Sequence, residues 1–220
     1  MDYLNILTAE MSAITLTLKL SLVTCIFLFF IGTPISLYLA FKKNKIIPIF
    51  ESLVTLPLVL PPTVIGFYLL VFFNPESVLG KFFITITGEQ LAFSFSGLVF
   101  ASIFYSLPFW VQPLQNSFEK IDKKILEAGT NMGGSRLDLL LKIILPSCKR
   151  GFLTAFILSF AHTIGEFGIV LMVGGNIQNK TRVLSISIYD HVEQLSYQHA
   201  HFLSIFLIFF SFFILLLLYY

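Results

Sequence analysis

The sequence predicts an all-α integral membrane protein with about five membrane-spanning helices, and two observations lead to this prediction. Hydrophobic residues make up 56% of the chain and charged residues only 12%, and the mean hydropathy is +0.88. This composition is typical of a chain whose main solvent is a lipid bilayer. The apolar residues also occur in runs of roughly 20, the length that a helix needs to cross the hydrocarbon core. In 220 residues these runs leave no room for a separate soluble domain, so we treat 1–220 as a single domain.

Five segments are apolar and long enough to span a membrane as helices. They are residues 15–41, 50–73, 92–114, 151–174 and 199–220. The first is longer than the apolar region of a signal peptide, has no basic stretch before it, and is not followed by a small-residue cleavage site. We therefore expect it to be retained as a membrane helix.

Prolines predict that the second and third segments are kinked. Pro57, Pro61 and Pro62 lie in the second segment, and Pro108 and Pro113 lie in the third. Each proline removes a backbone donor and bends a helix, which lipid tolerates only where neighbouring helices or a cavity satisfy the freed groups. The alternative is that proline is simply commoner in membrane helices. We favour a packed bundle with a pathway along the second to fifth segments.

Basic residues are distributed unequally between the connecting segments. Residues 42–49 contain three lysines and residues 115–150 contain seven basic residues, whereas the intervening connections contain Lys81, Lys180 and Arg182. Because cytoplasmic connections carry an excess of Lys and Arg, this asymmetry places 42–49 and 115–150 in the cytoplasm. The N-terminus is then outside and the C-terminus inside.

The sequence of residues 115–150 predicts two short helices joined by a glycine elbow. Residues 121–132 form a weakly amphipathic helix, which the Gly133-Gly134 pair ends, and Ser135 and Asp138 have the spacing of a capping box that begins a second helix. The second helix has an apolar stripe of Leu137, Leu140, Leu141 and Ile144. Such a helix either lies on the lipid surface or places its apolar face in a partner's groove. The missing side chain of Gly133 would let two backbones approach closely.

The spacing of residues in this loop resembles the EAA-loop signature of ABC importer membrane subunits, EAA-x3-G-x9-I-x-L-P. The matching positions are Glu127, Ala128, Gly129, Gly133, Ile143, Leu145 and Pro146, with Gly129 where a second alanine is usual. The resemblance implies a type I importer permease in which this loop docks on a separate ATPase subunit. ATP and magnesium would be bound by that subunit, so this chain would be a transport subunit without a cofactor and not an enzyme.

Three further segments resemble the molybdate-type permeases among these importers. They are residues 55–70, 162–177 and 181–193, and sulfate permeases share much of the same pattern. The resemblance implies import of a tetrahedral oxyanion, molybdate or tungstate, with a sulfate or thiosulfate permease as the alternative. It also implies two copies of this chain, two ATPase subunits and an extracytoplasmic oxyanion-binding protein in a prokaryotic cytoplasmic membrane. An ATP-independent anion channel would explain the membrane spans but not the EAA-like loop, and we expect no nucleic-acid partner.

Ionisable residues inside the predicted spans are candidates for a pathway or gate, because a charge in lipid is costly. Glu166 lies in the fourth segment, one helical turn from His162, and its predicted depth matches that of Lys19 in the first segment. We predict that Glu166 and Lys19 pair, with a local hydrogen-bonded role for Glu166 as the alternative. For His162, packing between helices is the alternative. The full candidate set is Lys19, Pro61, Pro62, His162, Glu166 and Gly168.

The connection between the fourth and fifth segments contains candidate contacts to the binding protein, Lys180 and Arg182. Exposed positive charges there could steer an acidic partner. Residues 174–181 nearly match a phosphate-binding loop, but Asn179 replaces the second glycine and no strand precedes the motif. We expect no metal site, because the nearby histidines have no metal-ligand spacing. Residues 178–198 are more apolar than a solvated loop requires, so we expect them to contact the rim of the bundle.

Overall fold

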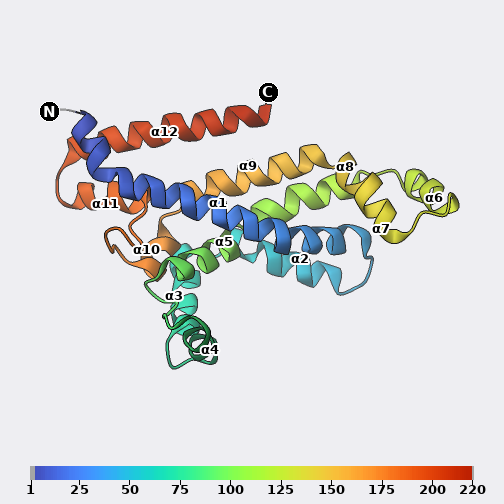
Figure 1. The fold of residues 1–220 in the computed structure, drawn as a ribbon, viewed down its shortest axis with the longest axis horizontal. Helices are drawn as coiled ribbons and strands as arrows, with labels where there is room; N and C mark the ends of the chain where they lie inside the picture. Colours follow the sequence, from blue (N-terminus) through green and yellow to red (C-terminus); the bar gives the residue numbers. More distant parts are fainter. Residues whose placement is uncertain (1–2, 220) are drawn as a thin grey trace.

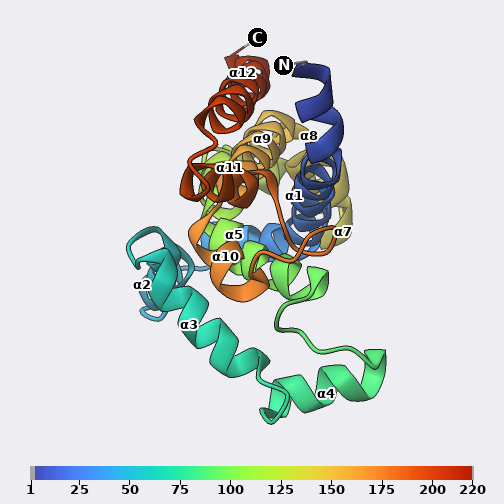
Figure 2. The same cartoon turned by 90° about the vertical axis from the view of Figure 1, so that its left-hand side faces the viewer.

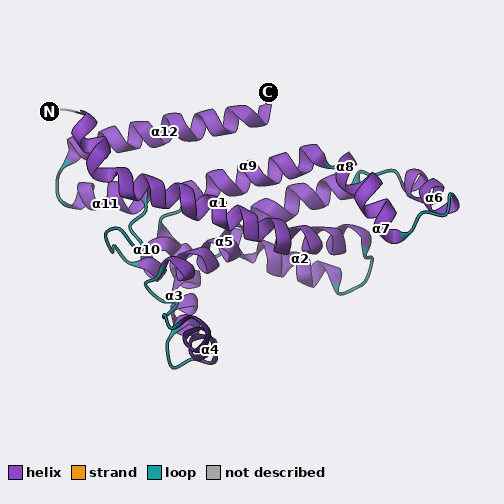
Figure 3. Cartoon of the chain, viewed as in Figure 1, coloured by secondary structure: helices purple, strands orange, loops and turns teal. Residues whose placement is uncertain are grey.

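The computed structural model describes the backbone of residues 3–219 and the side chains of residues 10–217, and every regular element in this part is a helix (Figures 1 and 3). The long helices are α1 (Tyr3–Phe41), α5 (Phe95–Glu119), α9 (Lys149–Gly165) and α12 (Tyr197–Tyr219). The shorter ones are α2 (Ile47–Thr55), α3 (Pro62–Phe73), α4 (Val78–Thr87), α6 (Lys123–Asn131), α7 (Arg136–Leu139), α8 (Leu145–Ser147), α10 (Gly168–Gly174) and α11 (Leu184–Glu193). A 3-10 turn (Leu56–Leu58) follows α2, and a π turn (Leu140–Ile144) joins α7 to α8.

Helix α5 is at the centre of the bundle, where it packs against α1, α9 and α10. In its most apolar stretch 56% of residues are buried, against 33% in α1 and 11% in α12. Trp110 and Phe118 of α5 pack with Leu28 of α1 in one buried cluster. Gly32 allows this approach, because a Cβ built there would lie 2.5 Å from the Trp110 ring. The central helix is therefore held by side-chain packing, and α12 lies at the periphery.

The second predicted span is broken at its prolines. Helix α2 and its 3-10 turn meet α3 at an angle of 106°. Pro61 has φ −56° and ψ 137°, which no α-helix accommodates, so α3 begins afresh at Pro62. The proline pattern predicted a kink at this point, and the structure confirms it.

The fourth predicted span, residues 151–174, is interrupted within the structure. Helix α9 ends at Gly165, Glu166 has an extended backbone with ψ 131°, and α10 begins at Gly168. The two glycines weaken the helix locally, and the Glu166 carboxylate accepts a hydrogen bond from the Ile169 amide at 3.0 Å, which starts a new helix. The predicted span 151–174 therefore consists of two helices, with Glu166 and Phe167 between them.

Two connections contain helices that the span assignment left out. Helix α4 begins at the Ser77 cap, where the hydroxyl accepts a hydrogen bond from the Gly80 amide, and ends at Gly88 with φ +74°. Together α3 and α4 project from the bundle (Figure 2). Helix α11 packs against α1 and α12, and its Ile186 is fully buried. The predicted contact of residues 178–198 with the bundle is confirmed.

Three helical stretches, Glu10–Phe41, Phe95–Glu119 and Tyr197–Leu217, are long and apolar enough to cross a membrane, and two bent pairs bring the number to five at most. The second bent pair joins Arg136–Ser147 to α9 at 65°. We assign α9 to the membrane and Arg136–Ser147 to the connecting segment, because the latter contains Asp138 and Lys142 beside exposed leucines. The first helix begins at Tyr3, well before the predicted residue 15.

Candidate functional site

The glycine elbow between α6 and α7 has the geometry of a helix-ending motif. The Gly134 amide donates to the Gly129 carbonyl at 3.1 Å, and the Gly133 amide donates to the Thr130 carbonyl at 2.9 Å. These two bonds define a Schellman motif, in which the residue after the helix adopts a left-handed conformation. Gly133 has φ +83°, which side chains disfavour. The chain direction therefore reverses sharply at Gly133.

A capping box starts the second helix directly after the elbow. The Ser135 hydroxyl accepts a hydrogen bond from the Asp138 amide at 3.1 Å, and the Asp138 carboxylate accepts one from the Ser135 amide at 3.2 Å. Lys142 forms an ion pair with the same carboxylate. The hydrogen bond from Lys142, and then those from Ser135, lower the pKa of Asp138 to about 2. These contacts favour the ionised form of Asp138, and the predicted cap is confirmed.

Gly129 and Ile143, two of the EAA-like positions, are brought together where α6 packs on the second helix. A Cβ built on Gly129 would lie 2.5 Å from Leu139 Cδ2 and 3.0 Å from Ile143 Cδ1. Gly133, by contrast, has nothing within 4 Å of a built Cβ. Within the chain the positive φ is what favours glycine at 133, and close approach of a partner's backbone at this position stays a prediction.

The remaining EAA-like positions lie on an open surface. Glu127, Ala128 and Pro146 are exposed, and Leu145 is half-buried. Around the elbow three large apolar side chains face outward, with exposed fractions of 88% for Met132, 65% for Leu137 and 54% for Leu141. We call this set, Met132, Leu137 and Leu141 with the adjoining groove of about 310 Å³ between Gly129 and Ile143, the elbow surface. Its apolar side chains have no cover within the described part of the chain.

Two of the predicted pathway residues come together where the broken spans meet. A Cβ on Gly168 would lie 2.6 Å from Pro62 Cβ, and one on Gly66 would lie 2.7 Å from Met172 Cβ. Helices α3 and α10 thus pack through glycines, directly beside the interruptions at Pro61 and Glu166. Interrupted backbone at membrane depth occurs where protein buries it or where it lines a cavity. Pro61 itself is exposed on this surface.

Glu166 and Lys19 do not pair. The Glu166 side chain accepts from the Ile169 amide, its carbonyl accepts from the Ser185 hydroxyl at 2.6 Å, and the residue is buried. The Lys19 ammonium lies 4.8 Å from the centre of the Phe95 ring. Among the described residues no ion pair joins the two. The predicted pair was wrong because matched depth says nothing about the direction in which each side chain points, and the helix break turns Glu166 toward its own chain.

His162 lies in a polar contact between α5 and α9. Its Nδ1 is 3.0 Å from the Ser106 hydroxyl, which is 2.9 Å from the Thr163 hydroxyl. The Phe109 ring stacks on the imidazole with 4.0 Å between ring centres. A histidine with these partners joins two helices, as the packing alternative predicted.

Arg182 is engaged inside the chain and is not a free external charge. Its guanidinium is 3.0 Å from Asp190 and 3.6 Å from Glu10, and only 16% of its side chain is exposed. Glu10 also accepts from the Ser187 hydroxyl at 2.6 Å and contacts His191 at 3.1 Å. We call these five residues the outer ion cluster. It corrects the prediction for Arg182, whereas Lys180 is exposed as predicted.

Sequence reasoning missed Glu10, which holds the cluster together. The residue precedes the first predicted span, and its partners lie in α11 and in the loop before it. The available signal was a lone acid close to an apolar run, with Arg182 and Asp190 together in a distant connection. Nothing in that pattern indicated which acid the arginine would meet.

Comparison with known proteins identifies the family. The model for binding-protein-dependent transport system inner membrane components matches residues 32–220. The chain belongs to this family. It is 47% identical to the molybdenum transport system permease protein ModB of Azotobacter vinelandii, covering 96% of this chain and 93% of that protein. It is 31% identical to a probable sulfate transport system permease protein of Chlorella vulgaris, and the match covers 94% of this chain and 77% of that protein.

Solved structures share the fold of this family member. A methionine ABC transporter in an inward-facing conformation matches with a TM-score of 0.75 at 16% identity, covering 99% of this chain and 96% of that chain. A bacterial alginate ABC transporter matches with a TM-score of 0.75 at 18% identity, and the match covers 94% of this chain and 76% of that chain. The predicted type I ABC importer permease fold and the multi-pass membrane location are confirmed.

Proposed function

We propose that this chain is the permease subunit of an ABC importer that moves a tetrahedral oxyanion, molybdate in the first place, into the cell. The observation that carries the proposal is the 47% identity to a molybdenum permease over 96% of the chain. Tungstate has the same shape and charge and belongs to the same substrate class. A sulfate permease is the second candidate, supported by the weaker similarity of 31%.

The elbow surface is the proposed contact to the ATPase subunit. Its exposed Met132, Leu137 and Leu141 are suited to a partner's groove, and the Schellman motif and capping box hold the two helices in a defined relation. ATP hydrolysis then takes place on that subunit. Helix α9 follows the elbow segment, so a displacement of the elbow passes along α9 toward the break at Glu166.

The two helix breaks are the proposed moving part of the pathway. The contact between Pro62 and Gly168 joins α3 to α10 through small groups without charge, which lets the helices shift against one another without exposing an acid to an anionic substrate. The Glu166 side chain accepts a hydrogen bond from the Ile169 amide in the first turn of α10, which keeps the interruption in place. A second copy of this chain would complete the pathway across their shared interface.

The proposed orientation places the elbow in the cytoplasm and the outer ion cluster outside. The two regions lie at opposite ends of the long axis (Figure 1), and the basic residues concentrate on the elbow side. An extracytoplasmic binding protein would then approach the end formed by α11 and the loop before it. Lys180 is the exposed cation there.

Competition for uptake tests the substrate. In a strain in which this system is the sole route, molybdate uptake is measured with tungstate or sulfate added in increasing excess. We expect tungstate to compete at concentrations similar to molybdate, and sulfate only at a large excess. Equal competition by sulfate would replace the molybdate proposal with the sulfate one. The control is a strain lacking this chain, which should show no competable uptake.

A further inference from the structure

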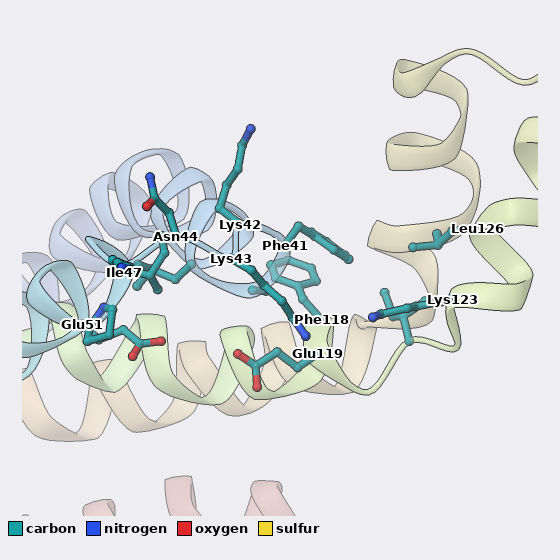
Figure 4. Close-up of a pocket in the computed structure, with 15 residues that line it drawn as sticks. Phe41, Lys42, Lys43, Asn44, Ile47, Glu51, Phe118, Glu119, Lys123 and Leu126 are labelled. Carbon is teal, nitrogen blue, oxygen red and sulfur yellow. The ribbon is translucent and has the colours of Figure 1, made fainter.

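A cavity of about 740 Å³ lies between the α1–α2 connection, the end of α5 and the start of α6 (Figure 4). This volume is within the range of roughly 300–1,000 Å³ that small-ligand sites occupy. Part of its wall is apolar, formed by Leu39, Phe41, Ile47, Pro48, Phe118 and Leu126. Four lysines also line it, Lys42, Lys43, Lys45 and Lys123. The lining of the cavity thus combines an apolar wall with four lysine ammonium groups.

The lysines of this cavity form no ion pair within the described part of the chain. Among the described residues, none of the four lysines has a carboxylate within 4.0 Å of its ammonium group. Figure 4 shows Lys43 and Lys123 directed toward the space beside Phe118 from two sides, whereas Lys42 points away from it. Like charges gathered on one cavity repel each other, and a bound anion would relieve that repulsion.

Two acids also line the cavity but belong to one wall. The Gln115 amide donates to Glu51 at 2.7 Å and to Glu119 at 2.9 Å, which holds both carboxylates where α2 faces α5. Lys123 comes from α6, on the other side of the cavity. With four cations and two anions the lining remains net positive, with three lysines from the α1–α2 connection and one from α6.

We propose that this cavity binds the phosphate headgroup of an anionic phospholipid from the leaflet on the elbow side. The adjoining surface of α2 is apolar and open, with exposed fractions of 60% for Ile49, 45% for Phe50 and 56% for Leu53. A lipid whose phosphate lies between Lys43 and Lys123 would place its acyl chains along these side chains. Basic pockets at the boundary of membrane helices bind anionic headgroups in this manner.

A lipid in this position would bridge the bundle and the elbow. Lys43 belongs to the α1–α2 connection, whereas Lys123 and Leu126 belong to α6, the helix that carries the EAA-like Glu127. The phosphate would therefore hold α6 against the bundle through charge. We expect anionic lipid to stabilise the elbow relative to zwitterionic lipid.

The experiment compares lipid binding by the purified transporter complex with and without the two inward-directed lysines. The complex is delipidated in detergent and titrated with phosphatidylglycerol or, separately, phosphatidylcholine, while thermal unfolding reports binding. Each lysine near an anionic surface contributes about fivefold in affinity. We therefore expect the Lys43→Gln/Lys123→Gln variant to bind phosphatidylglycerol about 30-fold more weakly than the unmodified complex, and neither protein to respond to phosphatidylcholine.

The matched control is Lys120→Gln/Lys124→Gln, which removes the same charge from the connection that contains Lys123, at positions that do not line the cavity. It should bind phosphatidylglycerol within about twofold of the unmodified complex. A Lys43→Arg/Lys123→Arg variant keeps the charge and should retain binding, which separates lost charge from lost folding. Equal losses in the glutamine variant and the control would overturn the proposal.

Two further measurements test whether a free oxyanion or the ATPase subunit, and not a lipid, occupies this cavity. Inorganic phosphate or molybdate at millimolar concentration should not reproduce the thermal shift, and if either did so the site would take a free oxyanion and not a lipid. Co-purification of the ATPase subunit should be unchanged in Lys43→Gln/Lys123→Gln. Loss of that subunit with unchanged lipid binding would assign the lysines to the partner and overturn the proposal.

Discussion

At the elbow, polar contacts join residues three or four positions apart, such as Ser135 with Asp138 and Lys142 with Asp138. At the opposite end of the molecule, Glu10 contacts Ser187 and His191, which lie 177 and 181 positions away. The elbow side chains are mostly exposed, whereas those of the outer ion cluster that form ion pairs are at most 19% exposed. The elbow can therefore form from its own sequence and present its surface to a partner, but the outer end depends on the whole bundle being folded.

The largest expected effect is at the outer ion cluster. Arg182→Met leaves Glu10 and Asp190 without the guanidinium that neutralises them. Removing one partner of a largely buried pair costs about 3 kcal/mol, so we expect a clear fall in the thermal unfolding temperature of the detergent-purified chain. Lys180→Met is the matched control and should change stability by less than about 0.5 kcal/mol. Similar values for the two variants would show that the cluster does not stabilise the outer end.

Substitutions at Gly133 test whether the conformation of the elbow is needed for coupling to the ATPase subunit. Leucine is strained at φ +83°, by roughly 1–2 kcal/mol, and adds bulk at the elbow. We expect Gly133→Leu to insert normally but to lose most of its uptake and of the binding-protein-stimulated ATP hydrolysis. Gly133→Asn tests whether backbone conformation or lack of bulk explains the glycine, because asparagine adopts the left-handed conformation more readily than leucine.

If Gly133→Asn retains most of the uptake, conformation explains the glycine. If asparagine fails as completely as leucine, the space at Gly133 is required by the docked ATPase. Unchanged uptake and assembly in Gly133→Leu would contradict the coupling role of the elbow.

The pH response of the elbow follows from Asp138. Its folded pKa of about 2 lies below the ordinary value of about 3.9, so the stability it contributes is present above pH 4 and is lost as the pH falls toward 2. We expect carboxyl carbon NMR of the detergent-solubilised chain to place its titration midpoint near pH 2. Lys142→Met should move the midpoint upward, since the hydrogen bond from Lys142 is the largest cause. A midpoint near 4 in both proteins would exclude the cap in solution.

A smaller effect is expected for Lys180, the exposed cation beside the cluster. Lys180→Gln should slow docking of the binding protein at low salt without altering the transport rate at saturating binding protein. The measurement is uptake against binding-protein concentration at two ionic strengths. Equal losses at low and saturating binding protein would argue against a steering role.

The smallest effect is expected from combining Lys19 and Glu166. Because each has its own partner, Lys19→Met and Glu166→Gln should have additive effects on stability, within about 0.5 kcal/mol. Glu166→Ala removes the hydrogen bond to the Ile169 amide at the start of α10 and should cost about 1 kcal/mol. A double-mutant cycle on thermal stability measures the coupling, and a coupling energy well above 0.5 kcal/mol would restore the ion pair that the structure lacks.

The sequence by itself determined which segments are apolar enough for the membrane, the break at Pro61 and Pro62, and both caps of the elbow. These features depend on composition, on proline chemistry and on contacts within about four residues, which the order of amino acids displays directly. The EAA-like spacing and the molybdate-type segments also indicated the family, because both are patterns of residue identity along the chain.

Only the tertiary structure decided which charges meet. Residue depth was predictable for Lys19 and Glu166, but the direction of each side chain depends on how the helices are rotated and on the break after Gly165. The partner of Arg182 depended on α11 folding back against α1, and the lysine-lined cavity on the α1–α2 connection lying beside α6. Such contacts arise from packing over long sequence separations, which local patterns of residues do not encode.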